Sequence, residues 1–171
     1  QRTGRFDEEL VRNQDDEYNF RIRELGGRIL LSPSIRSRYF SRSSFSSLSR
    51  QYFQYGYWKV RVCQLHPRQM SVRQFVPLVF VTTLLVLGLA SVFSEIAFWS
   101  LLAVVAAYTV ANVGASIVSA RSNLARVPLV SFSFLLLHVS YGIGSLIGLV
   151  VFRNRWREPA ARPAFADHGQ R

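Results

Sequence analysis

Three long uncharged runs constrain the fold of this 171-residue chain more than any other feature. They cover residues 74–94, 96–120 and 127–152 and consist mostly of Leu, Val, Ala, Phe and Ile. At about 1.5 Å per helical residue, each run is long enough to cross the roughly 30 Å hydrocarbon core of a bilayer. Three such runs in succession are not typical of a soluble protein. We therefore expect about three transmembrane helices.

The charges between these runs predict how the chain is oriented. Glu95 alone separates the first two runs, which favours a helical hairpin, whereas the 121–126 loop carries two arginines. Because cytoplasmic loops are rich in Lys and Arg, we expect residues 1–73 and this loop in the cytoplasm and Glu95 outside. Three full crossings would place the basic, flexible tail of residues 153–171 outside, against the same rule. The sequence leaves open whether the third run crosses once, forms a hairpin or is an ordinary helix that violates the rule.

Composition narrows the class of protein further. The net charge is +11 although 49% of the residues are hydrophobic, which excludes a wholly disordered chain. Cys63 is the single cysteine, so no internal disulfide can form. Nucleic-acid binding would rest on charge and interleaved aromatic residues alone, and the apolar runs count against it. The cations that precede residue 74 instead suit anionic lipid headgroups.

The polar part of the chain predicts an α/β segment over residues 1–42 and an amphipathic interface helix within residues 43–73. Asp15, Asp16 and Glu17 stand where a helix would begin, and two glycines at 26–27 would end it. A short strand is expected over residues 28–32. A second helix is expected to begin at Ser43 or Ser44.

The order of motifs in this part resembles a known enzyme family. The motifs are Gly4-Arg-Phe-Asp7-Glu-Glu, Asn13-Gln-Asp15-Asp-Glu17, Arg21 and Gly26-Gly-Arg-Ile. They resemble the second half of the catalytic domain of inverting family 2 glycosyltransferases, closest to bacterial exopolysaccharide transferases of the succinoglycan type. The resemblance covers nearly the whole chain. It implies an α/β C-terminal half of a GT-A domain, followed by the transmembrane helices.

In this family an acid at the position of Asp15 removes the proton of the acceptor hydroxyl, and the resemblance implies that role here. Gln14 stands where many members have Glu. The alternative is that the acid run only complements the positive end of a helix. The resemblance also implies contacts with substrate for Gln14, Asp16, Arg21, Arg50, Gln51, Gln54, Tyr57 and Trp58.

The segment Gln54-Tyr-Gly-Tyr57-Trp58 resembles the Q-x-x-R-W motif of processive members, in which an arginine stands at the position of Tyr57. The difference favours addition of a single sugar over polymerisation. Rings here could stack on sugars, and Arg50 or Lys59 could neutralise a pyrophosphate. A Tyr- and Trp-rich helix at the membrane interface is the simpler alternative, and both readings can hold together.

The family binds a nucleotide-sugar donor and a divalent metal, Mg or Mn, through an Asp-x-Asp motif that this sequence lacks. We therefore expect the chain to be the C-terminal piece of a multi-pass protein of the bacterial inner (plasma) membrane. Its catalytic part would be cytoplasmic and inactive alone. Its acceptor would be a polyprenyl-linked glycan used in exopolysaccharide synthesis.

The alternative is a non-enzymatic polytopic membrane protein, such as a transporter or an assembly subunit with a basic cytoplasmic domain. This alternative accounts for the apolar runs but not for the grouping of acids before Arg21. Within the third run, His138 is either a functional polar group or a hydrogen-bond partner of a neighbouring helix. The spacing of Gly144 and Gly148 predicts close helix packing.

Overall fold

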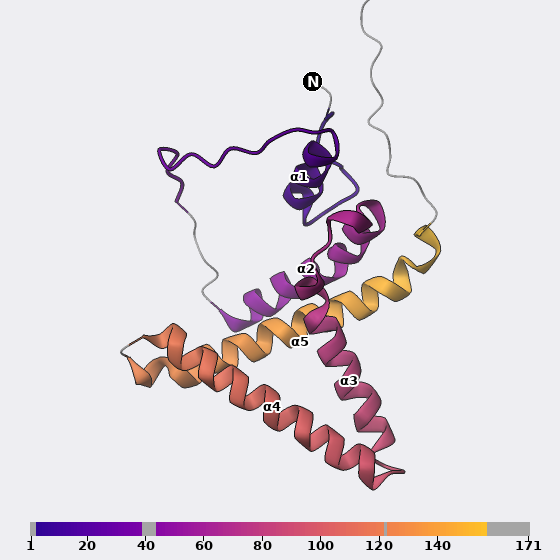
Figure 1. Cartoon of the computed structure of the whole chain (residues 1–171), viewed down its shortest axis with the longest axis vertical. Coiled ribbons are helices and arrows are strands. Elements are labelled where there is room, and N and C mark those ends of the chain that lie inside the picture. The colour runs from indigo at the N-terminus through magenta and orange to yellow at the C-terminus, as the bar shows by residue number, and fades with distance from the viewer. Residues whose placement is uncertain (1–2, 39–43, 122, 157–171) are drawn as a thin grey trace, which may run out of the picture.

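The structure is a computed structural model that describes residues 3–38, 44–121 and 123–156. Within these ranges the regular secondary structure is helical, with short 3₁₀ turns beside the longer helices (Figure 1). The five α-helices are α1 (Gln14–Glu24), α2 (Phe45–Leu65), α3 (Val76–Ala90), α4 (Glu95–Ala120) and α5 (Val127–Val151). The greater part of the predicted tail, residues 157–171, lies outside the described residues.

The predicted α/β GT-A half is wrong for the part of the chain that the structure describes. Residues 28–32 carry no strand, and Leu30 and Leu31 are 89% and 93% exposed. A strand needs a neighbouring strand for its backbone hydrogen bonds, and no described segment pairs with these residues. The short apolar run at residues 29–31 therefore did not suffice, because strand formation depends on burial and cross-strand contacts that are missing here.

Local signals placed both ends of α1 and the start of α2 correctly. The acids Asp15 to Glu17 lie in the first turn of α1, and the helix ends just before Gly26, whose φ of 76° is a left-handed conformation. The amide of Gly27 donates to the carbonyl of Ile22 at 2.8 Å, which closes the last turn. Ser44 caps α2 by accepting from the amide of Ser47 at 3.2 Å.

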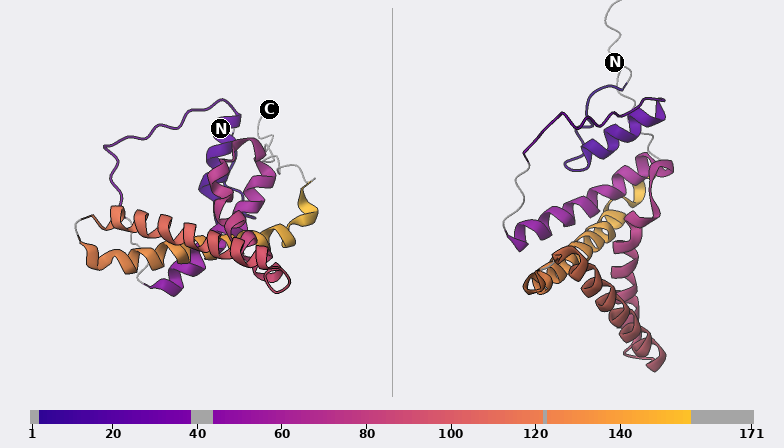
Figure 2. Two further views of the ribbon diagram at one scale, coloured as in Figure 1. Left: turned by 60° about the horizontal axis from the view of Figure 1, so that its bottom comes forward. Right: turned by 60° about the vertical axis from the view of Figure 1, so that its left-hand side comes forward.

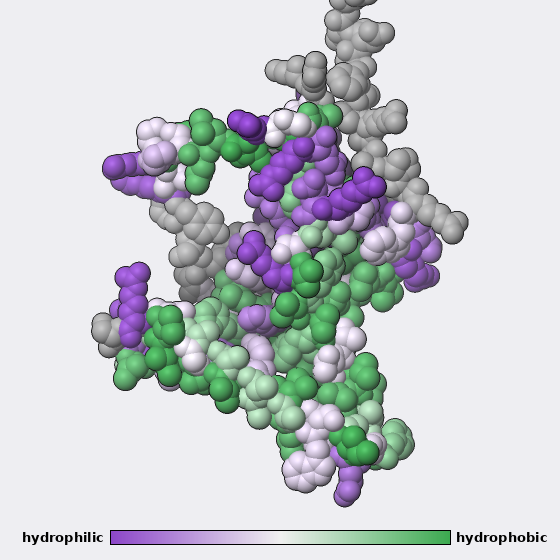
Figure 3. Space-filling view, viewed as in Figure 1, coloured by the Kyte–Doolittle hydropathy of each residue, from purple (hydrophilic) through white to green (hydrophobic). Residues whose placement is uncertain are grey.

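Three segments are long and apolar enough to cross a membrane, namely Val72–Ala90, Glu95–Ala120 and Leu124–Val151, with mean hydropathies of 1.9 to 2.0. The first two form the predicted hairpin, with its turn at residues 91–94. In Figure 3 apolar side chains cover these helices, whereas hydrophilic side chains gather over α1. The chain therefore has the helices of a membrane protein.

The closest helix pair joins the polar half to the apolar half. α2 lies along α5 with the same chain direction, because Ser49 contacts Ser140 and Gln64 contacts Phe152. A Cβ added to Gly144 would lie 2.1 Å from the carbonyl oxygen of Phe53, so the two backbones nearly touch. Gly148 meets α2 in the same way, which confirms the predicted close packing of these glycines.

Candidate functional site

The first turn of α1 is held on the middle of α2 by polar side chains. Arg12 Nε donates to Gln54 Oε1 at 3.0 Å, Asn13 Nδ2 donates to the carbonyl oxygen of Tyr55 at 3.0 Å, and Lys59 forms an ion pair with Asp16. Asn13 is buried and has a φ of 62°, a left-handed conformation that asparagine tolerates better than most residues. These contacts fix where Asp15 stands.

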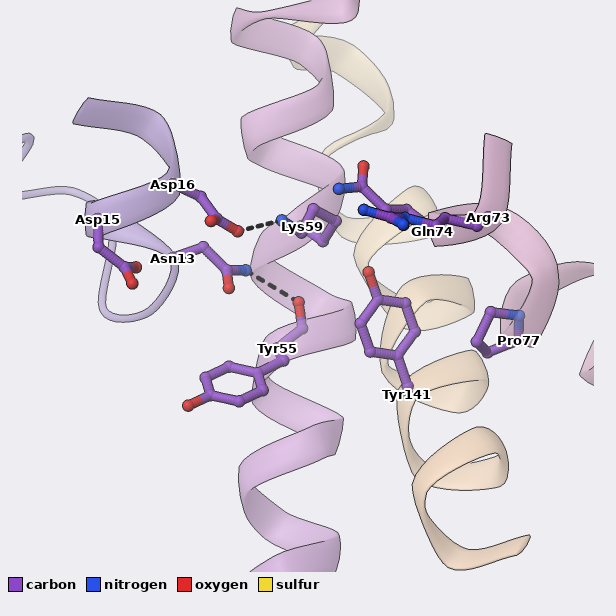
Figure 4. Close-up of a pocket in the computed structure, with 9 residues that line it drawn as sticks. All are labelled: Asn13, Asp15, Asp16, Tyr55, Lys59, Arg73, Gln74, Pro77 and Tyr141. Atoms are coloured by element: carbon purple, nitrogen blue, oxygen red, sulfur yellow. Dashed lines mark hydrogen bonds and ion pairs between the residues drawn. The ribbon is translucent and has the colours of Figure 1, made fainter. Parts of the chain in front are cut away.

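A cavity of about 440 Å³ opens where α1, α2, α5 and the start of α3 meet (Figure 4). Its walls come from Asn13, Asp15 and Asp16 of α1 and its cap, Tyr55 and Lys59 of α2, Arg73, Gln74 and Pro77 at the start of α3, and Tyr141 of α5. Figure 4 shows the two carboxylates on the α1 side and Arg73, Gln74 and the Tyr141 hydroxyl on the far side. The cavity thus joins polar segments to the first turn of an apolar helix.

The two adjacent aspartates in this cavity differ in their contacts. Asp16 is paired with Lys59, whereas the exposed side chain of Asp15 forms no hydrogen bond or ion pair with the described residues. Asp15 is therefore available to a ligand, and Asp16 holds α1 in place while partly neutralising Lys59. Arg73 is exposed on the opposite wall and adds a positive charge at the membrane-proximal edge.

The other predicted site residues lie elsewhere. Gln14 donates to the carbonyl oxygen of Asp7 at 3.3 Å. Arg21 donates to the carboxylate of Glu17 at 2.7 Å and to the carbonyl oxygen of Thr3 at 2.8 Å. Both side chains therefore stabilise the segment around α1 rather than line the cavity.

The predicted substrate-binding residues of α2 lie in two different environments. Arg50, Gln51 and Gln54 line a second cavity of about 310 Å³ beside the start of α2. Tyr57 and Trp58 instead pack on Phe152, with ring centroids 4.9 and 5.6 Å away. These two rings therefore join α2 to the end of α5. The structure brings only Asp15 and Asp16 of the predicted residues into the larger cavity.

Six residues of the larger cavity were not predicted as site residues, namely Asn13, Tyr55, Arg73, Gln74, Pro77 and Tyr141, whereas Lys59 was a candidate to neutralise a pyrophosphate. Lys59 and Tyr141 each carry a signal along the sequence. Lys59 is the only lysine of the chain, and Tyr141 brings a hydroxyl into an apolar run. Neither signal says that the two residues face the same cavity, because they are 82 positions apart.

A buried histidine stabilises the same junction from the other end of α2. His66 is 2% exposed, and its two ring nitrogens contact Glu17 at 3.2 Å and Glu24 at 2.9 Å. Burial alone would lower the pKa of His66, but the two carboxylates outweigh it and raise that pKa. Burial would likewise raise the pKa of Glu17, but hydrogen bonds from His66 and Arg21 lower it. The charged pair is thus favoured.

These shifts predict how the docking of α1 on α2 depends on pH. The raised pKa of His66 gives stability that is complete below its ordinary value of 6.5 and is lost as pH rises through the folded-state pKa. The lowered pKa of Glu17 gives stability that is present above 4.5 and is lost as pH falls through its folded-state pKa. We therefore expect the protein to be most resistant to thermal unfolding between pH 4.5 and pH 6.5, where both contributions are present. A His66→Gln variant should lose the decline at high pH, and an unchanged profile would contradict this assignment.

His138 is a partner of a neighbouring helix. Its Nδ1 lies 2.8 Å from the carbonyl oxygen of Phe134 and 3.3 Å from the hydroxyl of Tyr108 on α4. These contacts satisfy the polar ring atom within the apolar helices. They favour the packing interpretation.

The described residues contain no group of three or more His, Cys, Asp or Glu side chains that could hold a metal ion. They therefore do not supply the ligands of the divalent metal that the resemblance implies. Comparisons with known protein families, curated proteins and solved structures give no match to the chain.

Proposed function

We propose that the chain carries the acceptor side of a membrane-bound glycosyltransferase. This enzyme would move a sugar from a nucleotide-sugar donor to a polyprenyl-linked glycan at the cytoplasmic face of a bacterial inner membrane. The observation that supports the proposal best is the larger cavity, which has an available carboxylate on one wall and cations on the others. It lies where the polar segments meet the first turn of α3.

A carboxylate suits the chemistry of sugar transfer. A sugar hydroxyl is a weak nucleophile until a base accepts its proton. In the proposed step the acceptor oxygen forms a bond to the anomeric carbon while the bond from that carbon to the donor phosphate breaks. The nucleoside diphosphate leaves with the electron pair, and the proton passes to the carboxylate of Asp15. Attack opposite the leaving group inverts the anomeric configuration.

The cations suit a lipid-linked acceptor. The phosphates of such a lipid lie at headgroup depth, above the apolar chains. Arg73 stands three residues before α3, and its guanidinium can hold phosphate through two hydrogen bonds. The hydroxyl of Tyr141 and the amide of Gln74 add neutral partners on the same wall. The cavity therefore offers phosphate contacts on the membrane side and a base on the water side.

The order of motifs around Asp15 also supports a family 2 glycosyltransferase. The proposal does not use the α/β fold, which the described residues lack, nor a metal, whose ligands they do not supply. Binding of the nucleotide-sugar donor is assigned to parts of the enzyme outside this chain. Tyr57 and Trp58 take no part in the proposed site because both rings pack on Phe152.

Arg73→Gln tests the phosphate contact. Since a hydrogen bond to a charged group contributes about 1.5–3 kcal/mol, we expect the KM for the lipid-linked acceptor to rise roughly tenfold to a hundredfold. The KM for the nucleotide sugar should stay the same. Steady-state transfer assays in membranes that contain the full protein measure both constants.

Arg126→Gln is the matched control. Arg126 is also exposed and also precedes an apolar helix that begins with Val-Pro, but it does not line the cavity. Its replacement should leave both constants unchanged. Equal effects of the two substitutions on the acceptor KM would mean that Arg73 acts only through general surface charge, and would remove the phosphate contact from the proposal.

A further inference from the structure

The third apolar helix crosses the open end of the α3–α4 hairpin instead of running beside it. A Cβ added to Gly142 of α5 would lie 2.4 Å from the carbonyl oxygen of Pro77 on α3, and Asn112 of α4 donates to the carbonyl oxygen of Ser131 at 3.1 Å. Pro77 lies 17 residues before Ser94 in the hairpin turn, and Asn112 lies 18 residues after it. Two points of α5 about 16 Å apart therefore meet the hairpin at the same distance from its turn.

The views of the whole chain agree with this reading. In Figure 1, α3, α4 and α5 form three sides of a triangle with the 91–94 turn at one corner. The right-hand view of Figure 2 shows α2 beside α5 and α1 on the far side of α2. A helix that closes such a triangle cannot be parallel to both arms of the hairpin. Length and hydropathy alone do not reveal this inclination.

The C-terminal end of α5 is attached to the polar half of the molecule. Arg155 forms an ion pair with Glu9, and Gln64 Nε2 donates to the carbonyl oxygen of Phe152 at 2.8 Å. The buried side chain of Arg61 donates to the carbonyl oxygen of Arg155 at 3.3 Å and pairs with Glu9 at 3.4 Å. These contacts place residues 152–155 on the same side of the molecule as α1 and the end of α2.

The two faces of α5 differ in polarity. Toward α2 the helix presents small and polar residues, and Ser145 Oγ donates to the carbonyl oxygen of Gly56 at 3.2 Å. Away from α2 it carries a stripe of exposed apolar side chains. These are Ile143, Ile147 and Val150, which are between 39% and 61% exposed.

We propose that the chain crosses the bilayer twice, through α3 and α4, and that α5 lies within the cytoplasmic leaflet beneath α2. The apolar stripe of α5 then contacts acyl chains, while α2 covers the opposite face. In this topology Arg73, Arg126 and Arg155 all lie on the cytoplasmic side, and Glu95 lies on the other side. This agrees with the rule that Lys and Arg are enriched in cytoplasmic segments. A third crossing would have to break the contacts of Arg155 and Phe152 with the polar half.

The labelling of single cysteines tests this topology in the full protein with Cys63→Ser. Asn154→Cys reports on the end of α5, Ser34→Cys on the polar half and Val92→Cys on the hairpin turn, and all three positions are exposed. A membrane-impermeant maleimide is applied to intact spheroplasts and to inverted vesicles. We expect Asn154→Cys and Ser34→Cys to be labelled in inverted vesicles but not in spheroplasts. Val92→Cys should be labelled in spheroplasts but not in inverted vesicles. Labelling of Asn154→Cys from the side of Val92→Cys, or from both sides, would overturn the proposal.

A disulfide assay decides the case in which position 154 does not react. Glu9→Cys combined with Arg155→Cys should form an intramolecular disulfide on mild oxidation in the membrane. The pair Val92→Cys and Arg155→Cys should not. Absence of the first disulfide together with formation of the second would place the end of α5 on the far side of the membrane. Absence of both would also contradict the proposal, because it would show that residues 9 and 155 do not meet.

Discussion

Asp15→Asn is expected to lower the rate of sugar transfer by about 10²–10⁴-fold, which is the range that a positioned general base contributes. The amide keeps the shape of the side chain but cannot accept the proton of the acceptor hydroxyl. Because Asp15 has no partner among the described residues, the substitution breaks no contact of the fold described here. Membrane insertion and donor binding should therefore survive. Initial rates of labelled sugar entering the lipid fraction measure the effect.

Glu95→Gln is the matched control for this substitution. Glu95 is also an exposed acid in the first turn of a helix, so both changes remove a similar favourable contact with a helix N-terminus. Its position at the hairpin turn is remote from the cavity. The control should transfer sugar at the normal rate. Equal rates for Asp15→Asn and Glu95→Gln would show that Asp15 only complements the helix dipole.

Gly56→Ala is expected to separate α2 from α5 and to destabilise the protein by at least about 1–3 kcal/mol, the usual cost of overpacking. A Cβ at this position would lie 2.0 Å from the carbonyl oxygen of Tyr141, so the backbones cannot keep their distance. Gly144→Ala meets the carbonyl oxygen of Phe53 at 2.1 Å and should act in the same way. Thermal unfolding of the detergent-purified protein measures the loss. The cavity should also open, since Tyr141 forms one of its walls.

Gly114→Ala and Gly88→Ala are controls of the same chemistry. Both glycines lie within apolar helices, and a Cβ added at either position has no neighbour within 4 Å. Because alanine favours helix more than glycine does, these variants should be unchanged or slightly more stable. If Gly56→Ala unfolded at the same temperature as Gly114→Ala, the close packing of α2 on α5 would be wrong.

Local rules explain which elements of the fold could be predicted. Apolar runs longer than 20 residues predicted α3, α4 and α5, and the single acid between the first two runs predicted the hairpin. The acids before Tyr18 and the glycines at 26–27 marked the ends of α1. Each of these signals acts over a few neighbouring residues. They therefore need no knowledge of the tertiary structure.

The prediction of a strand over residues 28–32 was wrong because a strand forms only beside another strand. The 28–32 segment contains a short apolar run of the length of a strand, but no described segment offers backbone groups to pair with it. The spacing of Gly144 and Gly148 likewise predicted close packing without naming the partner. That partner is α2, which carries Arg50, Lys59 and Arg61 and was expected to lie at the interface as a separate element.

The candidate site was only partly predictable for the same reason. Asp15 and Asp16 stand in a motif that can be recognised along the sequence, whereas Arg73 and Tyr141 join them only through packing of α3 and α5 on α2. Tyr57 and Trp58 show the converse, since a motif suggested sugar contacts and the structure uses both rings to hold Phe152. Sequence resemblance can suggest a role for a residue, but the neighbours of a side chain depend on tertiary packing.

Transfer of labelled sugar into lipid tests the central proposal most directly. Bacterial membranes containing the full protein are incubated with a panel of radiolabelled nucleotide sugars, and the lipid fraction is then extracted. We expect the label to enter lipid-linked glycan with the wild-type protein and with Glu95→Gln, and to be reduced at least about a hundredfold with Asp15→Asn. An unlabelled lipid fraction from correctly inserted wild-type protein, with every donor sugar and with native lipid acceptors present, would contradict the proposed function. It would favour a membrane protein without transferase activity.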